Sequence, residues 1–282
     1  MAQRERPRAH ISKCLLTGKG SEPMALHKDM FDEIARYYDP IMAHVDYDRW
    51  FMVVTELSAM LEPGFRHLDA ACGTGVLLKM LRRTGWRSMG IDLSHAMLRA
   101  AGKNGIAPPA AVADMRALPF AGAFDYVTCL FDSMNFLVAL KDVQQALHAF
   151  YAVMAPNSLL YFDVVTERMV QDHYADDEWI EDNGRFTTTW RNHYDHKRKV
   201  IICDIRVNTG RACHLIERIY RREQLEHAAT KAGFRLLHVC DAHAWRPPTK
   251  KTVRMDFLAV KGDPGPFRKQ LKAICTRIRK RL

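Results

Sequence analysis

The segment 65–163 constrains the fold most, because short apolar runs and amphipathic stretches alternate along it. Apolar runs of this length predict strands, and the stretches between them predict helices. Strands are expected near 66–71, 87–91, 109–113, 124–130 and 158–164, and helices near 75–84, 94–103 and 140–154. Alternating strands and helices are joined by right-handed crossovers and build a parallel sheet that is covered on both faces. We therefore expect a doubly wound α/β domain.

The chain after this segment is expected to add an inserted sheet and then to complete the first one. Residues 165–220 contain β-forming runs separated by turn residues, which predicts a small antiparallel sheet. A helix that ends at Gly233 and two more strands follow, so the main sheet is expected to have seven strands. The insertion is expected to have strands at 186–194, 200–207 and 213–220. The helix is expected at 222–232 and the last two strands at 235–241 and 252–260.

Two helices are expected before the first strand, one beginning at Phe31 and one over 50–61. Residues 1–27 are polar and lack periodicity, and we interpret them as a flexible basic arm. Residues 264–282 form a basic stretch with apolar residues at helical spacing, which predicts an amphipathic helix. Its apolar stripe either docks on its own domain or contacts an anionic membrane or nucleic-acid surface.

The net charge of +10 is concentrated at the two ends of the chain. Residues 1–28 hold six Lys/Arg and two Glu, and residues 264–282 hold seven Lys/Arg and no acid. The remainder carries 29 basic against 30 acidic residues, so a basic groove for nucleic acid is not expected there. The seven cysteines are scattered without a C-x-x-C pair, and no run of 18 apolar residues or secretory signal is recognisable. A reducing, cytoplasmic location is the expectation.

The strongest chemical signal is a glycine turn where the first strand runs into a helix. Asp69 ends the strand, and the turn that follows contains Ala71, Cys72, Gly73 and Gly75. The glycines let a ligand approach main-chain N–H groups, and the N-terminus of the next helix favours a negative group. In an open α/β sheet, such a turn predicts a nucleotide-binding site.

Acidic residues also follow the second and third strands. Asp92 ends the second strand in G-I-D, where its carboxylate can accept hydrogen bonds from both ribose hydroxyls. Asp114 follows the third strand in A-D-M and can accept from an adenine amino group, with Met115 and Leu93 on the two faces of the ring. We therefore expect these four residues to bind an adenosine.

The turn separates two classes of adenosine ligand. A dinucleotide turn has the pattern G-x-G-x-x-G, but Leu78 stands at the third glycine position. Asp69 would also lie beside the pyrophosphate of a dinucleotide, whereas it suits a ligand with an ammonium and a sulfonium. The pattern therefore favours S-adenosylmethionine and ranks an NAD dehydrogenase last.

The fourth strand ends in F-D-Y-V-T-C-L-F-D-S-M-N, which places polar side chains at the same edge of the sheet. Phe131 is expected beside the cofactor, and the methyl acceptor is expected at Asp132, Ser133 and Asn135. With L-D-A-A-C-G-T-G, G-I-D and A-D-M, this motif resembles the successive motifs of class I methyltransferases. The resemblance covers about residues 30–260, and it implies a Rossmann-like methyltransferase domain over 28–263. The family often has Gly where this chain has Ala71, so the turn is bulkier here.

Two further segments resemble the small-molecule branch of this family. Y-Y-D followed by H-V-D-Y-D-R-W resembles its N-terminal lid, which implies that Tyr37 or Tyr38 closes over the methionine end of the cofactor. The inserted sheet with W-R-N-H-Y-D resembles amine methyltransferases related to those that act on amino sugars and glycine. This resemblance implies a small-molecule acceptor, with an amine nitrogen as the methyl acceptor.

Methyl transfer is an in-line displacement that needs alignment of the reactants and no nucleophilic side chain. If the acceptor has to lose a proton, Asp132, His193 or Tyr194 are the candidate bases, and Trp190 is a candidate substrate contact. His193 and His196 form H-x-x-H, but residues three apart on a strand point to opposite faces, so no metal is expected.

Other functions stay open at this point. The basic tails are compatible with an RNA or protein methyltransferase, although no N-P-P-Y-type motif follows the fourth strand. Y-Y-D-P-I-M followed by R-W also resembles quinone-type C-methyltransferases, and the terminal helix would then contact a membrane. A cofactor-binding regulator without turnover and a homodimer also stay open.

Overall fold

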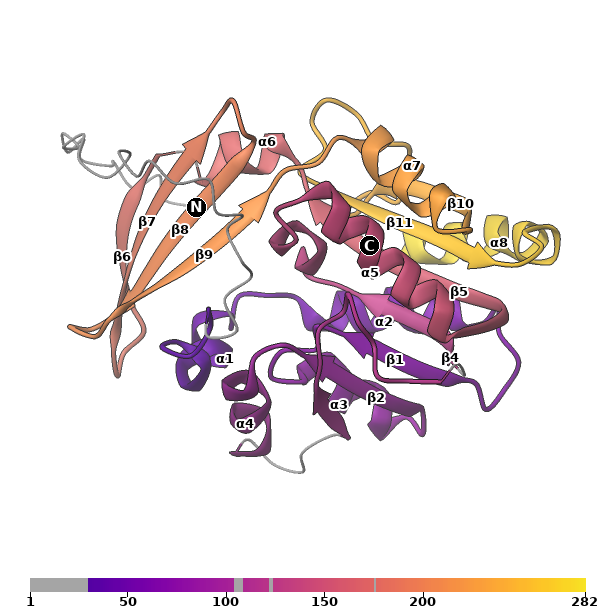
Figure 1. Ribbon diagram of the computed structural model, residues 1–282, viewed down its shortest axis with the longest axis horizontal. Coiled ribbons are helices and arrows are strands. Elements are labelled where there is room, and N and C mark those ends of the chain that lie inside the picture. The colour runs from indigo at the N-terminus through magenta and orange to yellow at the C-terminus, as the bar shows by residue number, and fades with distance from the viewer. Residues whose placement is uncertain (1–29, 104–108, 122–123, 175) are drawn as a thin grey trace.

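The computed structural model describes residues 30–103, 109–121, 124–174 and 176–282. Its largest element is a seven-stranded sheet with the order β10-β11-β5-β4-β1-β2-β3 (Figure 1). Only β11 runs against its neighbours in this sheet. The strands are β1 (Arg66–Ala70), β2 (Arg87–Asp92), β3 (Ala110–Val112), β4 (Phe124–Cys129), β5 (Met154–Val165), β10 (Arg235–Asp241) and β11 (Arg254–Lys261). The expected seven-stranded, mostly parallel sheet is confirmed.

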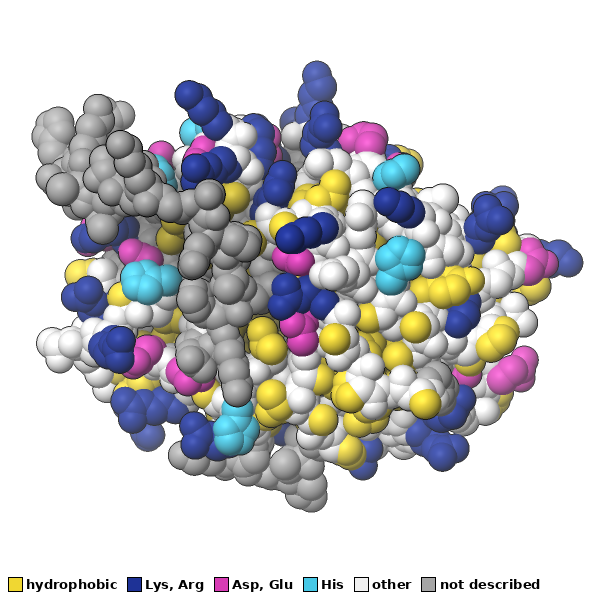
Figure 2. Space-filling model, viewed as in Figure 1, with side chains coloured by type: hydrophobic (Ala, Val, Ile, Leu, Met, Phe, Trp, Pro, Cys, Tyr) yellow, Lys and Arg dark blue, Asp and Glu magenta, His cyan; other side chains and the backbone are white. Residues whose placement is uncertain are grey.

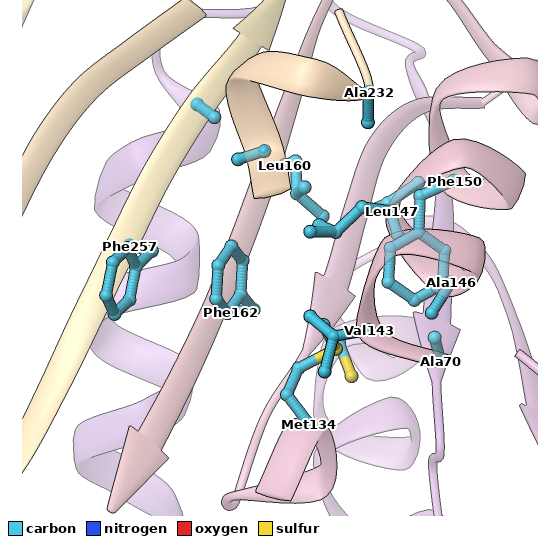
Figure 3. Packing of buried hydrophobic residues seen from close by; sticks show 14 of the residues in the cluster. Ala70, Met134, Val143, Ala146, Leu147, Phe150, Leu160, Phe162, Ala232 and Phe257 are labelled. Atoms are coloured by element: carbon cyan, nitrogen blue, oxygen red, sulfur yellow. The ribbon is translucent and has the colours of Figure 1, made fainter. Parts of the chain in front are cut away.

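Helices cover both faces of this sheet, as the doubly wound pattern requires. One face packs against α5 (Leu140–Val153) and α7 (Arg222–Lys231), and the other against α2 (Tyr47–Ser58), α3 (Val76–Arg83) and α8 (Gly265–Arg281). On the first face, Phe162 and Phe257 of adjacent strands stack with ring centroids 4.8 Å apart, beside the apolar side chains of α5 (Figure 3). This rigid core fixes where the strands end.

A second sheet lies beside the first, with the order β6-β7-β8-β9 and antiparallel pairing throughout (Figure 1). Its strands are β6 (Glu178–Asp182), β7 (Thr187–Asp195), β8 (Val200–Val207) and β9 (Ala212–Arg218). The predicted insertion is therefore present and has a fourth strand, β6. Short helical segments α6 (Glu167–Met169) and η3 (Val170–Tyr174) lead from β5 to it.

The N-terminal helix expected from Phe31 is much shorter in the structure. Only η1 (Ala35–Tyr37) and α1 (Tyr38–Ile41) form there, because Pro40 has no N–H to continue a helical ladder. This segment packs against the inserted sheet: Ile34 and Ile41 are buried against β8 and β9. The second expected helix is present as α2, which begins after Asp46, whose carboxylate caps the N–H of Arg49 at 2.9 Å.

The remaining predicted helices are α4 (His95–Lys103) and α8. The apolar stripe of α8 is buried against α2 and the sheet, apart from the last residue, Leu282. Arg277 and Arg281 on the same helix pair with Glu56 of α2 at 2.7 and 2.9 Å. The stripe therefore docks on its own domain, and the alternative of a membrane contact through this stripe is not supported. In the described part of the chain, no helix is long and apolar enough to cross a membrane.

Candidate active site

The turn after β1 adopts the left-handed backbone that its glycines allow. Gly73 and Gly75 have φ angles of 58° and 73°, and Ala71 has a φ of 58°. A non-glycine residue in this region costs about 1–2 kcal/mol, so the turn is strained at the position where the family often has Gly. The main chain of the turn is held from β2: the N–H of Cys72 donates to the carbonyl of Ile91 at 2.9 Å.

Asp92 ties this turn to the end of β2. One of its carboxylate oxygens accepts from the N–H of Gly73 and the other from the N–H of Ser94, both at 2.8 Å. Each oxygen keeps a lone pair that can accept from a ligand hydroxyl. Burial raises the pKa of Asp92, and the two N–H donors oppose that shift. The side chain of Ser94 accepts from the N–H of Met97 and caps α4, and Asp92 lines the cavity.

Asp69 lies beneath the turn at the end of a chain of buried hydrogen bonds. Its carboxylate accepts from the hydroxyl of Thr128 at 2.7 Å, so Thr128 must accept from His67 Nε2 at 2.9 Å. Burial lowers the pKa of His67 to about 3, so the ring is neutral, and its Nδ1 accepts from Ser88 at 3.0 Å. Burial raises the pKa of Asp69 to about 7. The carboxyl group is therefore poised to ionise when a cation lies beside it.

A single cavity of about 320 Å³ joins these residues to the inserted sheet. We call the part nearest the glycine turn the donor half, and it is lined by Asp69, Ala71, Cys72, Gly73, Asp92 and Met115. The part beneath the inserted sheet is the acceptor half, lined by Asp132, Trp179, Trp190, Asn192, Glu217 and Arg254. Tyr38 and Phe131 also line the cavity. Thr74 donates to Asp39, which anchors the N-terminal segment to the turn.

The structure brings eleven of the residues predicted for the site to the wall of this cavity. For the cofactor they are Tyr38, Asp69, Ala71, Cys72, Gly73, Asp92, Met115 and Phe131, and for the acceptor Asp132, Ser133 and Trp190. Leu93 and Gly75 follow cavity residues in the chain but do not line the cavity. Gly75 instead begins α3 as its N-cap.

Three residues that were predicted to contact a ligand make other contacts within the fold. Both oxygens of Asp114 accept from Arg116, at 2.6–3.0 Å, so its carboxylate is engaged away from the cavity. The ring of Tyr37 packs against Phe186 with centroids 4.7 Å apart, and of the two tyrosines only Tyr38 lines the cavity. Asn135 is fully buried, and its amide bonds the backbone of Val165 and Arg218.

The two other candidate bases also lie outside the cavity. His193 is half-exposed on the outer face of β7 and contacts Asp176 at 3.2 Å. Tyr194 points to the inner face but donates to Glu167 at 3.2 Å, and burial raises its pKa. Of the three candidates, only Asp132 lies where an acceptor can reach it.

The turn after β4 holds Asp132 within a buried ionic cluster. Phe131 and Asp132 both have left-handed φ angles, 61° and 53°, and such strain persists only where surrounding contacts enforce it. Asp163 of β5 accepts from the N–H of Asp132 at 3.1 Å. Arg254 of β11 donates to Asp132 at 3.0 Å and also to Asp163. Both carboxylates raise the pKa of the guanidinium, against the effect of burial.

Glu217 of β9 completes the acidic side of the cavity. It forms a hydrogen bond with Asp132, and burial together with that carboxylate raises its pKa well above the ordinary value for Glu. The sequence analysis did not identify Glu217, Arg254, Asn192 and Trp179, which come from four strands and carry no shared motif. A signal was present in β7, where Trp190 and Asn192 alternate with Arg191 and His193 and so share one face.

The donor half fits the cofactor that the sequence predicts. Gly73 lines the cavity with a left-handed φ that favours glycine, so its main chain is not covered by a side chain of its own. Asp92 presents free acceptor lone pairs, Asp69 presents a carboxyl group that ionises beside a cation, and Met115 supplies an apolar wall. No group of three or more potential metal ligands occurs among the residues that the structure describes.

Comparisons with known proteins agree with this geometry. Residues 42–239 match the family model "Methyltransferase domain". The chain is 28% identical over 243 residues to the putative methyltransferase YqeM of Bacillus subtilis, covering 82% of this chain and 97% of that protein.

Solved structures share the fold at lower identity. An S-adenosylmethionine-dependent methyltransferase from Clostridium acetobutylicum superposes with a TM-score of 0.72 at 24% identity, covering 83% of this chain and 99% of the other. The sugar N-methyltransferase KedS8 from Streptoalloteichus sp. superposes with a TM-score of 0.62 at 20% identity, covering 90% of this chain and 100% of the other. With the family match over most of the chain, the prediction of an S-adenosylmethionine-dependent methyltransferase is confirmed, and the protein belongs to the methyltransferase domain family.

Proposed function

We propose that this methyltransferase acts on the nitrogen of a small-molecule amine that binds in the acceptor half. The observation that carries the proposal is the charge of that half. Asp132 and Glu217 face the cavity, and Glu181 lies at its margin. The one guanidinium among the lining residues, Arg254, is already paired with Asp132 and Asp163. The net field therefore attracts a cation and repels a phosphate or a carboxylate.

Aromatic side chains support the same choice. Trp179 and Trp190 lie directly opposite each other on β6 and β7, with ring planes 4° apart and centroids 5.5 Å apart. Their indole N–H groups are engaged by Glu181 and Thr188, so what they offer a ligand is ring surface. Tryptophan faces attract ammonium groups as well as apolar ones.

The donor half would hold the cofactor through the residues that line it. Asp69 would face the ammonium, Asp92 the ribose hydroxyls, and Met115 the adenine, with Tyr38 and Phe131 closing the cavity. When bound, S-adenosylmethionine supplies a methyl group that its sulfonium has activated for displacement. The chain then has to align the acceptor nitrogen, exclude water and remove a proton from an acceptor that arrives as an ammonium.

Glu217 is the group we assign to that proton. Burial and Asp132 raise its pKa, so an ammonium beside it has to favour the ionised form before it can accept a proton. Once ionised, that carboxylate is a stronger base than an ordinary glutamate, which suits transfer from an ammonium near neutral pH. Asp132 lies next to it and is held in place by the guanidinium of Arg254. The N–H proton of the acceptor would therefore pass to Glu217, leaving the nitrogen lone pair free to attack the methyl carbon.

The charge on the outside of the protein gives less support to a nucleic-acid substrate. On the face shown in Figure 2, Lys and Arg side chains are scattered among acidic and apolar ones and form no continuous stripe. The basic arm 1–27 lies outside the described residues. The name of the fold relative KedS8, a sugar N-methyltransferase, supports an amine acceptor. A homodimer stays a prediction from the sequence.

A methyl-transfer screen tests the proposal. Purified protein is incubated with S-adenosylmethionine and amines, phenols, quinones or RNA, and S-adenosylhomocysteine and the methylated product are measured by mass spectrometry. We expect turnover with amines, a decrease of about 100-fold in Glu217→Gln, and no change in His193→Gln, which alters the outer face of the same sheet. Turnover confined to quinones or RNA would contradict the proposal.

A further inference from the structure

Asn192 is a buried amide in the acceptor half that the fold itself does not use. Its side chain is 2% exposed, and neither Oδ1 nor Nδ2 has a hydrogen-bond partner among the described residues. Its backbone N–H is satisfied by the carbonyl of Asp177, so the strand does not need the side chain. Buried polar groups without a partner are rare in folded proteins, and they recur at sites that a ligand completes.

The neighbours of Asn192 explain why its amide turns to the cavity. On the inner face of the sheet, Cys203 lies directly across on β8 and Leu215 follows on β9. Trp190 is two residues away on the same strand and the same face, and its indole N–H already donates to Thr188 at 3.2 Å. None of these side chains is a good partner for an amide. All three neighbours and Asn192 itself line the cavity.

The free amide selects the chemistry of its ligand. It offers one acceptor, Oδ1, and two donors on Nδ2, so the best partner is a group that both donates and accepts. A hydroxyl does both. A carboxylate can only accept, and it would also be repelled by Asp132 and Glu217. The apolar ring faces of Trp179 and Trp190 lie beside the amide and favour a carbon skeleton.

We propose that Asn192 binds a hydroxyl group of the acceptor, so that the enzyme selects a hydroxylated amine over the same amine without its hydroxyl. This inference rests on the proposed function and adds a specificity residue to it. The nitrogen lies toward Asp132 and Glu217, and the hydroxyl lies toward Asn192 of β7, which shares a sheet face with Glu217 of β9 and is separated from it by β8. A site built to bond a hydroxyl rejects the analogue that lacks it, because its own polar group is then left unpaired.

Two amines and two variants test this inference. The probes are 2-aminocyclohexanol and cyclohexylamine, which differ by one hydroxyl. The variant Asn192→Leu keeps the volume and removes both amide atoms, and His193→Leu is the matched control on the outer face of the same strand. The measurements are kcat/KM for both amines, and calorimetric affinity for both amines in the presence of S-adenosylhomocysteine.

We expect the wild type and His193→Leu to prefer 2-aminocyclohexanol by about tenfold or more in both measurements. Asn192→Leu should lose that preference through weaker binding of the hydroxylated amine, while cyclohexylamine is bound equally well or better. Affinity for S-adenosylhomocysteine should not change, because Asn192 lies outside the donor half.

If the wild type shows equal kcat/KM and equal affinity for the two amines, the inference is overturned and the proposed function is not affected. An equal loss for both amines in Asn192→Leu would also overturn it, since a general packing role predicts that result. If neither amine is methylated although S-adenosylhomocysteine binds, and the screen also yields no methylated amine, the proposed function fails. The calorimetric preference for the hydroxylated amine, and its loss in Asn192→Leu, then decides the role of Asn192 separately.

Discussion

The donor and acceptor halves of the cavity are built in opposite ways. In the donor half, the carboxyl groups of Asp69 and Asp92 are each held by partners from the chain itself. In the acceptor half, Asn192 has no partner for its amide, and Asp132 sits in a strained turn held by Arg254. The donor site is therefore preorganised by the fold, whereas the acceptor site depends on a buried ionic cluster and contains an amide that is left for a ligand.

The largest effect is expected from Arg254→Met, which removes the cation from that cluster. Asp132 and Asp163 would then remain buried without it, which costs about 3–5 kcal/mol for a broken buried ion pair. Urea unfolding followed by circular dichroism measures the loss. Arg277→Met is the control, because its pair with Glu56 is half-exposed and is worth about 0–1 kcal/mol. Similar losses in the two variants would show that the cluster does not hold the acceptor half together.

A smaller effect, confined to the donor half, is expected from Asp92→Ala. Hydrogen bonds to a charged group contribute about 1.5–3 kcal/mol, so affinity for S-adenosylhomocysteine should fall by about 10- to 100-fold. Calorimetry measures the affinity, and Asn192→Leu serves as the control with unchanged binding. An unchanged affinity in Asp92→Ala would show that this carboxylate serves only the turn that contains Gly73.

The same comparison explains how much of the site could be predicted from the sequence. The donor half is made largely of residues at or directly after the ends of β1 and β2, so the strand pattern predicted that Asp69, Gly73 and Asp92 lie together, and all three line the cavity. The same pattern predicted Asp114 beside the adenine, but its carboxylate pairs with Arg116, two residues away, and it does not line the cavity. A motif predicts where a side chain lies, but it does not predict which neighbouring groups form hydrogen bonds with that side chain.

The acceptor half could be predicted only in part, because its residues meet through pairing of distant strands. Asp132 was found from its place after β4, but Arg254 reaches it from β11 and Glu217 from β9. The main sheet was predictable because its strands are long apolar runs that alternate with helices. The face of β7 that points inward was readable from its alternation, yet His193 was ranked with Trp190 although the two lie on opposite faces.

The packing under the glycine turn gives the third prediction. A Cβ at Gly90 would lie 2.5 Å from Cys72 Sγ and 2.8 Å from Leu78 Cδ2. Gly90→Ala should therefore lower the free energy of unfolding by about 1–3 kcal/mol through overpacking. Gly90→Ala combined with Cys72→Ala removes the nearer contact and should recover part of that loss. The double-mutant cycle measures this coupling, and additive losses would show that Cys72 does not limit the space behind the turn.

The smallest effect is a pH dependence of the affinity for S-adenosylhomocysteine. It should follow the titration of Asp69, which belongs to the donor half. Its raised pKa of about 7 means that the ligand-free carboxyl group is neutral below pH 7 and ionised above it. The ammonium of S-adenosylhomocysteine favours the ionised form, so affinity should rise between about pH 5.5 and pH 7.5, by at most about tenfold per pH unit. For stability the sign is opposite: a carboxyl group with a raised pKa in the folded state stabilises the ligand-free protein at low pH, and this contribution is lost as the pH rises to about 7. Calorimetry across this range should show the slope in the wild type and not in Asp69→Asn, and a slope that persists in the variant would assign the titration to another group.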